Sequence, residues 1–404
     1  MKNRLAPQKL IILFLSVIAI VFYFSPKRIA ICEETDKNKA ENEFYDSVDE
    51  KVAGLDADDF EKYYESLTSE EKDVLGFGTI KALVSYVSKN GLSAKTFRSF
   101  FSLTAKSMAK GLTLLLPAFV SVMIISVLSG LLRGLTSDLL KKETSEVICI
   151  VLYVAAVLTV LGTLVPMLNT VKLTVGRVKK LSEAVFPVLT VLTTALGGTV
   201  SAGIYSPLTV CFSSVLIALI DAVILPCFIA VVVFSVVGNV SENVKLEKMT
   251  GFFKSFSSWL LGISFSLFVS FATFQGVSGA AVDGAKMSAA KKLVSGSVPI
   301  VGDYLADGFD IALVSTGLIK NSVGLTGVLV LAATTLAPLI KIVAFLLLSK
   351  LTSAVSEAVG DKKISAMLSG MAKSASLLVS TLAGITFVFT VLLMLMIFTF
   401  NPGV

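Results

Sequence analysis

The sequence contains no histidine, so the side chain that most often serves as general base, proton switch and metal ligand is missing. It also contains no G-x-x-x-x-G-K-[ST] pattern, which excludes ATP hydrolysis by a P-loop. The four cysteines are scattered without C-x-x-C spacing, so neither a disulfide framework nor a zinc site is indicated. Two S-x-x-K matches, at 69–72 and 288–291, are expected by chance in a chain rich in serine and lysine and do not favour a hydrolase.

Charged side chains are scarce as well. They make up 16% of the chain, against 54% hydrophobic residues and a mean hydropathy of +0.85, whereas a soluble domain carries about a quarter charged residues. A membrane-spanning helix needs roughly 20 mostly apolar residues. Six apolar windows are about that long or longer: 112–132, 147–168, 209–237, 259–276, 325–348 and 377–400. The sequence therefore predicts an all-α polytopic membrane protein with about six transmembrane helices.

The first 32 residues have the order of a signal sequence. Lys2, Arg4 and Lys9 precede a short apolar core at 10–24, which is the pattern of a secretory signal peptide. The small-x-small cleavage match at 30–32 is loose, so the segment is either a cleaved signal peptide or an uncleaved anchor. Both alternatives export the residues that follow.

Residues 33–111 are predicted to form an exported, acidic, helical region. Between 33 and 73 there are sixteen acidic and five basic side chains, while the whole chain has a net charge of +6. Loops rich in basic residues usually lie on the cytoplasmic side of a membrane, whereas acidic residues have little effect on the orientation of a membrane protein. Because the lysines of the remaining chain flank apolar segments, lipid headgroups rather than nucleic acid are the expected partner of the positive charge.

Helix starts are predicted inside this exported region at Asp56 with Asp59 and at Thr68 with Glu71, from the spacing of a capping residue and a third-position acid. Farther on, aromatic and apolar residues between 97 and 108 fall on one helical face among basic residues. That face fits either a helix lying in the headgroup layer or the core face of a small helical domain.

One phrase occurs twice. KKLSEAVFPVL at 179–189 and KKLVSGSVPIV at 291–301 share an offset that also aligns Pro187 with Pro299 and, farther on, Pro226 with Pro338. Matches in the same order relative to the apolar segments predict an internal duplication. The expected organisation is a first transmembrane hairpin at 112–168, a first repeat at 169–278 and a second repeat at 279–404. The prolines are expected to kink their helices.

The repeats suggest how the chain is threaded. The stretch after Pro299 carries Asp303, Asp307, Asp310 and Lys320, and each such charge disfavours a lipid-exposed span by roughly 2.5–3.5 kcal/mol. We therefore predict a re-entrant or interfacial segment there and, by analogy, at 187–206. Six spans then place the exported region and the C-terminus on the same side of the membrane. The lysines of 169–186 and 278–324, which this topology places outside, are in tension with the positive-inside rule.

Two ionisable residues lie well inside apolar windows. Asp221 precedes Pro226 in one window, and Lys341 follows Pro338 in another. Such residues usually face a polar cavity, a partner or one another, so both are candidate pathway residues. The alternatives are a structural hydrogen-bond partner for Asp221 and snorkelling for Lys341. Asp303, Asp307 and Asp310 would share one helical face and are weaker candidates, because a solvated face explains them equally well.

SVPIVGDYLADGFDIALVSTGLIKNSVGLTGVLVL at 297–331, LAPLIKI at 336–342 and GLLRGL at 130–135 resemble the stage III sporulation protein AE family of endospore-forming bacteria. The resemblance implies a multi-pass protein of the mother-cell membrane around the forespore, in an apparatus with an export-type ATPase and ring-forming subunits. The family has no established catalytic residues, and no cofactor is implied. The expected function is a non-enzymatic channel or export-apparatus subunit; the alternative is an independent secondary transporter that uses the membrane charges.

Overall fold

The computed structural model describes residues 37–92, 94–135, 142–240, 246–297, 301–359 and 361–399, and every element in these ranges is helical. The elements are α2 (Lys37–Ala53), α3 (Asp58–Glu65), α4 (Ser69–Leu75), α5 (Ile80–Asn90), α6 (Ala94–Leu135), α7 (Lys142–Ala195), α8 (Thr199–Leu219), the π-helical turn η1 (Ile220–Ile224), α9 (Leu225–Val237), α10 (Glu247–Ser297), α11 (Val301–Ala358) and α12 (Lys362–Phe398). The predicted all-α class is confirmed. The signal segment at 1–32 lies outside the described residues.

Six stretches are long and apolar enough to cross a membrane, as predicted. They are Arg98–Arg133, Thr144–Ala195, Cys211–Val237, Glu247–Ser270, Leu313–Ala358 and Lys362–Phe398. Several of the helices are far longer than a bilayer requires: α11 has 58 residues, which at 1.5 Å per residue is roughly 87 Å, against about 30 Å of hydrocarbon. The bundle therefore extends well beyond the membrane on at least one side.

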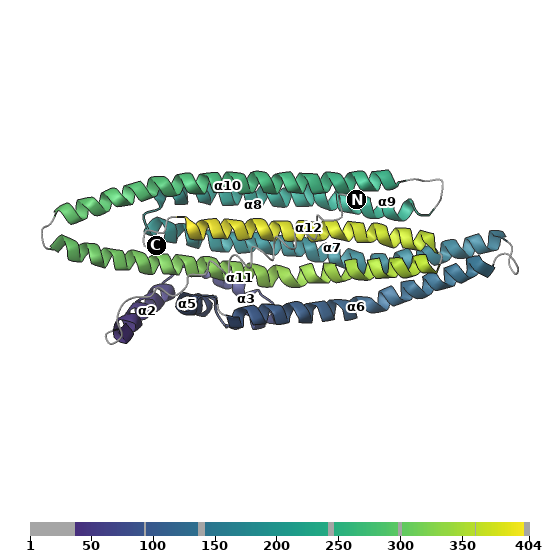
Figure 1. Cartoon of the computed structure of the whole chain (residues 1–404), viewed down its shortest axis with the longest axis horizontal. Helices are drawn as coiled ribbons and strands as arrows, with labels where there is room; N and C mark the ends of the chain where they lie inside the picture. Colours follow the sequence, from purple (N-terminus) through teal and green to yellow (C-terminus); the bar gives the residue numbers. More distant parts are fainter. Residues whose placement is uncertain are drawn as a thin grey trace.

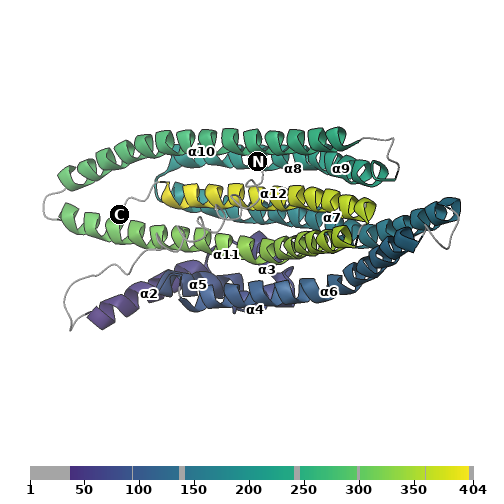
Figure 2. The ribbon, with the colours of Figure 1, turned by 45° about the vertical axis from the view of Figure 1, so that its right-hand side comes forward.

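The helices run side by side in an elongated bundle (Figures 1 and 2). The last turns of α6, α9 and α11 and the first turns of α7, α10 and α12 gather at one end of it. Arg133 at the end of α6 pairs with Asp361 before α12 at 3.4 Å, which fixes two of these helix ends together. We call this the loop end of the bundle. The junction of α7 with α8 and the last turn of α12 lie toward the other end.

The core runs along α12, which is mostly apolar and mostly buried between Ile364 and Ile397, with Ala366 and Lys373 exposed. A helix of this kind is stable only where other helices or lipid surround it. Here α11 packs along it, and small residues permit close approach: a Cβ built on Gly384 would lie 2.0 Å from the ring of Phe265 in α10. α12 is therefore the central helix around which the spans are arranged.

Exposed large apolar side chains form a belt near the loop end. Most of them lie at 114–131 in α6, 147–165 in α7, 229–237 in α9, 249–267 in α10 and 347–351 in α11, while Phe101, Leu173, Val191, Val215, Val240 and Phe398 are exposed outside these stretches. The stretches in α6, α7 and α10 each cover roughly 26–27 Å along the helix axis, close to the thickness of the hydrocarbon layer. This belt is the surface that fits a bilayer, and the other half of the bundle projects past it.

The two stretches predicted to be re-entrant or interfacial have different backbone structures within the described residues, and their placement relative to the membrane stays a prediction. Residues 301–358 form one continuous helix, and 187–206 comprises the end of α7, a turn and the start of α8. The turn is possible because Gly197 adopts φ +95°, which other residues rarely do. In the repeat frame, 196–198 would align with 308–310, which are helical in α11. The duplication itself stays a prediction.

One charged residue of the predicted re-entrant segment after Pro299, Lys320, is buried together with a hydrogen-bond partner. Lys320 is fully buried in α11 and donates to the carbonyl oxygen of Thr399, at the end of α12. A buried ammonium group is tolerated when it is hydrogen-bonded. The contact also places the end of α12 beside the first third of α11.

Helices α2–α5 form a layer beside α11 (Figure 2), and their buried side chains, such as Phe60, Tyr64 and Leu83, belong to the same apolar core as the bundle. The predicted capping box at Thr68 is confirmed: its side chain accepts from Glu71 N–H at 3.4 Å, and the Glu71 carboxylate accepts from Thr68 N–H at 2.8 Å. The predicted start at Asp56 is wrong, because α3 begins at Asp58 after an N-cap at Ala57 without a side-chain cap. The region has no sharp boundary at 111, since α6 is continuous from Ala94.

Candidate functional site

Asp221 lies in the π-helical turn η1 and is exposed on the bundle surface. The turn has a local cause: Pro226 follows it and cannot donate a backbone hydrogen bond, and Leu225 N–H bonds back to Ile220 C=O, five residues earlier. Such bulges inside helices often mark functional positions. An exposed carboxylate on an apolar helix fits contact with another molecule better than a place in an internal pathway.

Lys341 lies in α11 and is partly exposed. Its Cα is 3.7 Å from the position that a Cβ on Gly111 of α6 would take, so α6 and α11 approach closely there. Among the described residues, neither Lys341 nor Asp221 makes an ion pair. The structure thus does not bring the two predicted pathway charges together.

The remaining predicted residues are dispersed. Asp303, Asp307 and Asp310 lie in the first turns of α11, far from the belt stretch of that helix, and their side chains are outside the described set. Pro187 is inside α7 and Pro338 inside α11, both without ending the helix. Pro299 lies outside the described residues. These positions form no common site in the described part of the chain.

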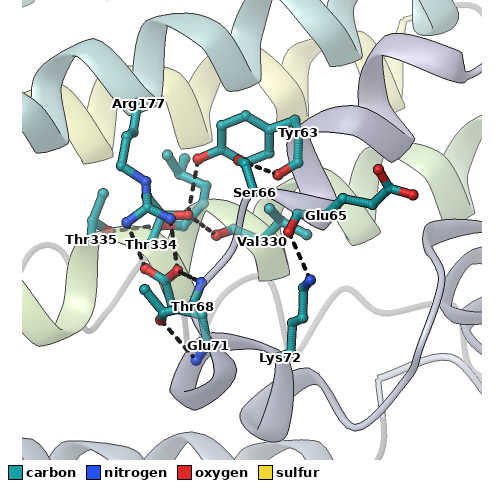
Figure 3. A network of polar contacts seen from close by, with 11 residues as sticks. Tyr63, Glu65, Ser66, Thr68, Glu71, Lys72, Arg177, Val330, Thr334 and Thr335 are labelled. Atoms are coloured by element: carbon teal, nitrogen blue, oxygen red, sulfur yellow. Dashed lines mark hydrogen bonds and ion pairs between the residues drawn. The ribbon is translucent and has the colours of Figure 1, made fainter.

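A buried polar network joins the N-terminal helices to the bundle instead (Figure 3). Glu71 of α4 is 5% exposed. Its two carboxylate oxygens accept from the two terminal nitrogens of Arg177 in α7, at 2.8 and 2.7 Å. Planar, bidentate pairs of this kind are the strongest arginine–carboxylate contacts. One carboxylate therefore both caps α4 and fastens it to α7.

Tyr63 of α3 extends the network to α11. Its hydroxyl lies 3.1 Å from the Thr334 hydroxyl, which in turn donates to the Val330 carbonyl at 2.9 Å. Figure 3 shows the Tyr63 ring, the Arg177 guanidinium and the Glu71 carboxylate gathered over this part of α11. Burial is the largest influence on the Tyr63 pKa and raises it, so the phenol stays neutral at physiological pH.

Weaker contacts complete the docking. Lys51 of α2 donates to the Ser315 hydroxyl of α11 at 2.6 Å, and Lys110 of α6 pairs with Glu70 on the surface. We call the contacts of Glu71, Tyr63 and Lys51 with α7 and α11 the docking interface. It contains no reacting group with a partner suited to nucleophilic or acid–base chemistry, and its arrangement is that of a structural joint.

Sequence reasoning missed this interface. In the sequence, Glu71 was identified only as a capping residue, and Arg177 is one of four basic residues in 169–186, a stretch that the predicted topology places outside. Three of the basic residues that this topology places outside have protein partners: Arg177, Lys320 and Lys179, which lies 3.7 Å from Glu183. These contacts reduce the disagreement with the positive-inside rule, because a basic residue that binds a protein group is weaker evidence for the side of the membrane on which it lies.

A small cavity lies between α7, α11 and α12. It is lined by Val185, Leu331 and Phe389, among others, and has a volume of about 10 Å³, which is at most the room of one water molecule. The lining is almost entirely apolar. This cavity is too small to hold a solute.

Comparison with known proteins finds one matching protein family and a curated relative. The family described as Stage III sporulation protein AE matches residues 79–399, from just before α5 to the end of α12. A protein of Bacillus subtilis (strain 168) named Stage III sporulation protein AE is 23% identical over 269 residues, which is 67% of each chain. No solved structure matches.

Proposed function

Because this chain belongs to the stage III sporulation protein AE family, we propose that it is a non-enzymatic subunit of the membrane apparatus that connects mother cell and forespore. It is a sporulation protein of multi-pass membrane character. In the proposal it lies in the mother-cell membrane around the forespore and works with an export-type ATPase and ring-forming subunits. The observation that carries this is the family match, and it is supported by the six candidate spans and by the buried Glu71–Arg177 pair, which joins α4 to α7 as a structural contact.

The direction in the membrane follows from charge. The loop end carries Arg133, Lys248, Lys350, Lys362 and Lys363, and basic residues favour the cytoplasmic side. We therefore assign the loop end to the mother-cell cytoplasm. Helices α2–α5 dock on the half of the bundle that projects past the belt, so in this orientation they face the space between the two membranes, where ring-forming subunits would meet them.

Site-specific photocrosslinking in sporulating cells tests the proposal. A photoreactive phenylalanine analogue at Phe101, which is 69% exposed next to the docked helices, should capture the ring-forming subunits. The matched control is the same probe at Leu158, 64% exposed inside the belt, where lipid should be the main neighbour. Capture of no sporulation subunit from Phe101, although the protein is present at normal abundance, would contradict the proposal.

The alternative, an independent secondary transporter, has one observation in its favour, the charges Asp221 and Lys341. It predicts that the purified protein in liposomes moves a solute, and that Asp221→Asn or Lys341→Met abolishes the flux. The exposure of Asp221 on the bundle surface argues for a contact with another subunit instead. Solute flux by the purified chain alone would favour the transporter over the assembly subunit.

A further inference from the structure

A groove opens at the loop end between α9, α10 and α12. It has a volume of about 870 Å³, within the range of pockets that hold small molecules. Phe234, Ser235 and Asn239 line it from the end of α9, and Leu246, Glu247 and Thr250 from the start of α10. Four lysines complete it: Lys248 of α10 and Lys362, Lys363 and Lys373 of α12. We call it the lysine groove.

Among the described residues, the lining of the lysine groove carries more basic than acidic side chains. Its one lining carboxylate is Glu247, and no ion pair joins any of the four lysines to an acid within the described residues. Lys254, partly buried in α10, adds further charge, because it lies close enough to Lys350 and Lys373 to be repelled by both. Like charges held together in a partly apolar site are unfavourable, so the groove is built for an anion.

The position of the groove identifies the kind of anion. Lys373 lies eleven residues into α12, roughly 16 Å from the helix start, so the groove reaches from the loop end into the apolar belt. The belt surface of α10 beside it is aromatic: Phe252 is 59% exposed, Phe256 stacks on it with ring centroids 6.1 Å apart, and Trp259 is 61% exposed. Aromatic side chains at this level are typical of the headgroup boundary.

We propose that the lysine groove binds the headgroup of an anionic phospholipid, with its acyl chains lying on the aromatic face of α10. A phosphodiester offers oxygens to several ammonium groups at once, and basic pockets between spans on the cytoplasmic side suit it. A soluble phosphate would satisfy the charge but would not use the exposed aromatic side chains of α10, where Phe252 follows the groove residue Lys248 by one helical turn. Binding of this lipid fixes the relative positions of α9, α10 and α12 at the membrane surface.

Native mass spectrometry of the purified full chain after reconstitution with equal amounts of phosphatidylglycerol and phosphatidylcholine tests the proposal. The wild-type protein should retain phosphatidylglycerol at least about tenfold over phosphatidylcholine. Replacing Lys362, Lys363 and Lys373 with glutamine should lower that preference on the order of 10- to 100-fold, from the contribution of each lysine near anionic lipid. The same positions changed to arginine should keep it, which separates loss of charge from loss of fold.

The matched control removes the same number of charges elsewhere. Lys172, Lys179 and Lys180 lie on α7 outside the groove, and their replacement with glutamine should leave the lipid preference unchanged. Equal retention of both lipids by the wild-type protein, or equal preference in the two glutamine triples, overturns the proposal. Displacement of phosphatidylglycerol by millimolar inorganic phosphate also overturns it, and assigns the groove to a soluble anion.

Discussion

Replacing Glu71 with glutamine should release the N-terminal helices from the bundle. The wild-type carboxylate accepts three hydrogen bonds, two from Arg177 and one from the Thr68 backbone. Glutamine keeps the shape but turns one acceptor into a donor that faces other donors, and it leaves Arg177 without its counter-charge. Breaking a buried pair by removing one partner costs about 3–5 kcal/mol.

The expected loss is smaller than that full value. The Arg177 side chain is 29% exposed and can recover water, while the Glu71 side chain is only 7% exposed. We therefore expect the docking interface to weaken by about 2–3 kcal/mol. At 1.4 kcal/mol per factor of ten, the population of the undocked state should rise by roughly 30- to 150-fold.

A buried thiol can report this population. Ser315 is 1% exposed and is covered by Lys51 of α2, so Ser315→Cys, in a chain whose native cysteines are replaced by serine, should react slowly with a membrane-impermeant maleimide. In the Glu71→Gln background its reaction should accelerate by the factor just given, provided that opening precedes labelling.

The adjacent acid supplies the control. Glu70 is 60% exposed and pairs with Lys110, which is 72% exposed, and exposed pairs contribute at most about 1 kcal/mol. Glu70→Gln should therefore change the labelling rate less than about fivefold. Equal acceleration by Glu70→Gln and Glu71→Gln would refute the reasoning, because burial and bidentate geometry would then have no special weight.

Three further outcomes are expected. The hydrogen bond from Lys89 lowers the pKa of Asp49 below its usual value of 3.8, so this pair stabilises the N-terminal layer above about pH 4 and the stabilisation is lost as the pH falls; Asp49→Asn should flatten that part of a proteolysis–pH profile. A Cβ on Gly130 would lie 2.5 Å from a backbone oxygen, whereas one on Gly162 meets nothing within 4 Å, so Gly130→Ala should lower the stability in detergent by about 1–3 kcal/mol and Gly162→Ala should leave it unchanged or raise it slightly. Asp221→Asn should leave thermal stability within about 0.5 kcal/mol while reducing spore titre, and normal sporulation would remove Asp221 from the candidate contacts.

Several local features could be predicted from the sequence. The six spans follow from apolar runs, because hydrocarbon requires nearly uninterrupted hydrophobicity over about 20 residues. The capping box at Thr68 follows from a spacing of three residues, since both of its hydrogen bonds lie within one helical turn. The same local reasoning failed at Asp56, where the spacing is present but the N-cap is Ala57, one residue later, and the helix begins at Asp58.

Other features depend on how distant helices pack. The continuity of α11 was not apparent from its charges, because the sequence does not reveal that Lys320 would be buried against the end of α12, 79 residues away. The exposed position of Asp221 likewise depends on which face of its helix meets the bundle, and its surroundings read from sequence alone suggested an interior site.

What the sequence determined by itself is the class of the protein, its number of spans, its charge distribution and its family, since each depends on composition or on short-range order. Only the tertiary structure decided that Glu71 meets Arg177, 106 residues away, and that lysines of α10 and α12 share one groove. The physical reason is the same in both cases. Burying a charged side chain costs desolvation free energy at any position in the sequence. Whether that side chain is paired within the protein, exposed to solvent or available to an external ion depends on the neighbours that helix packing places around it.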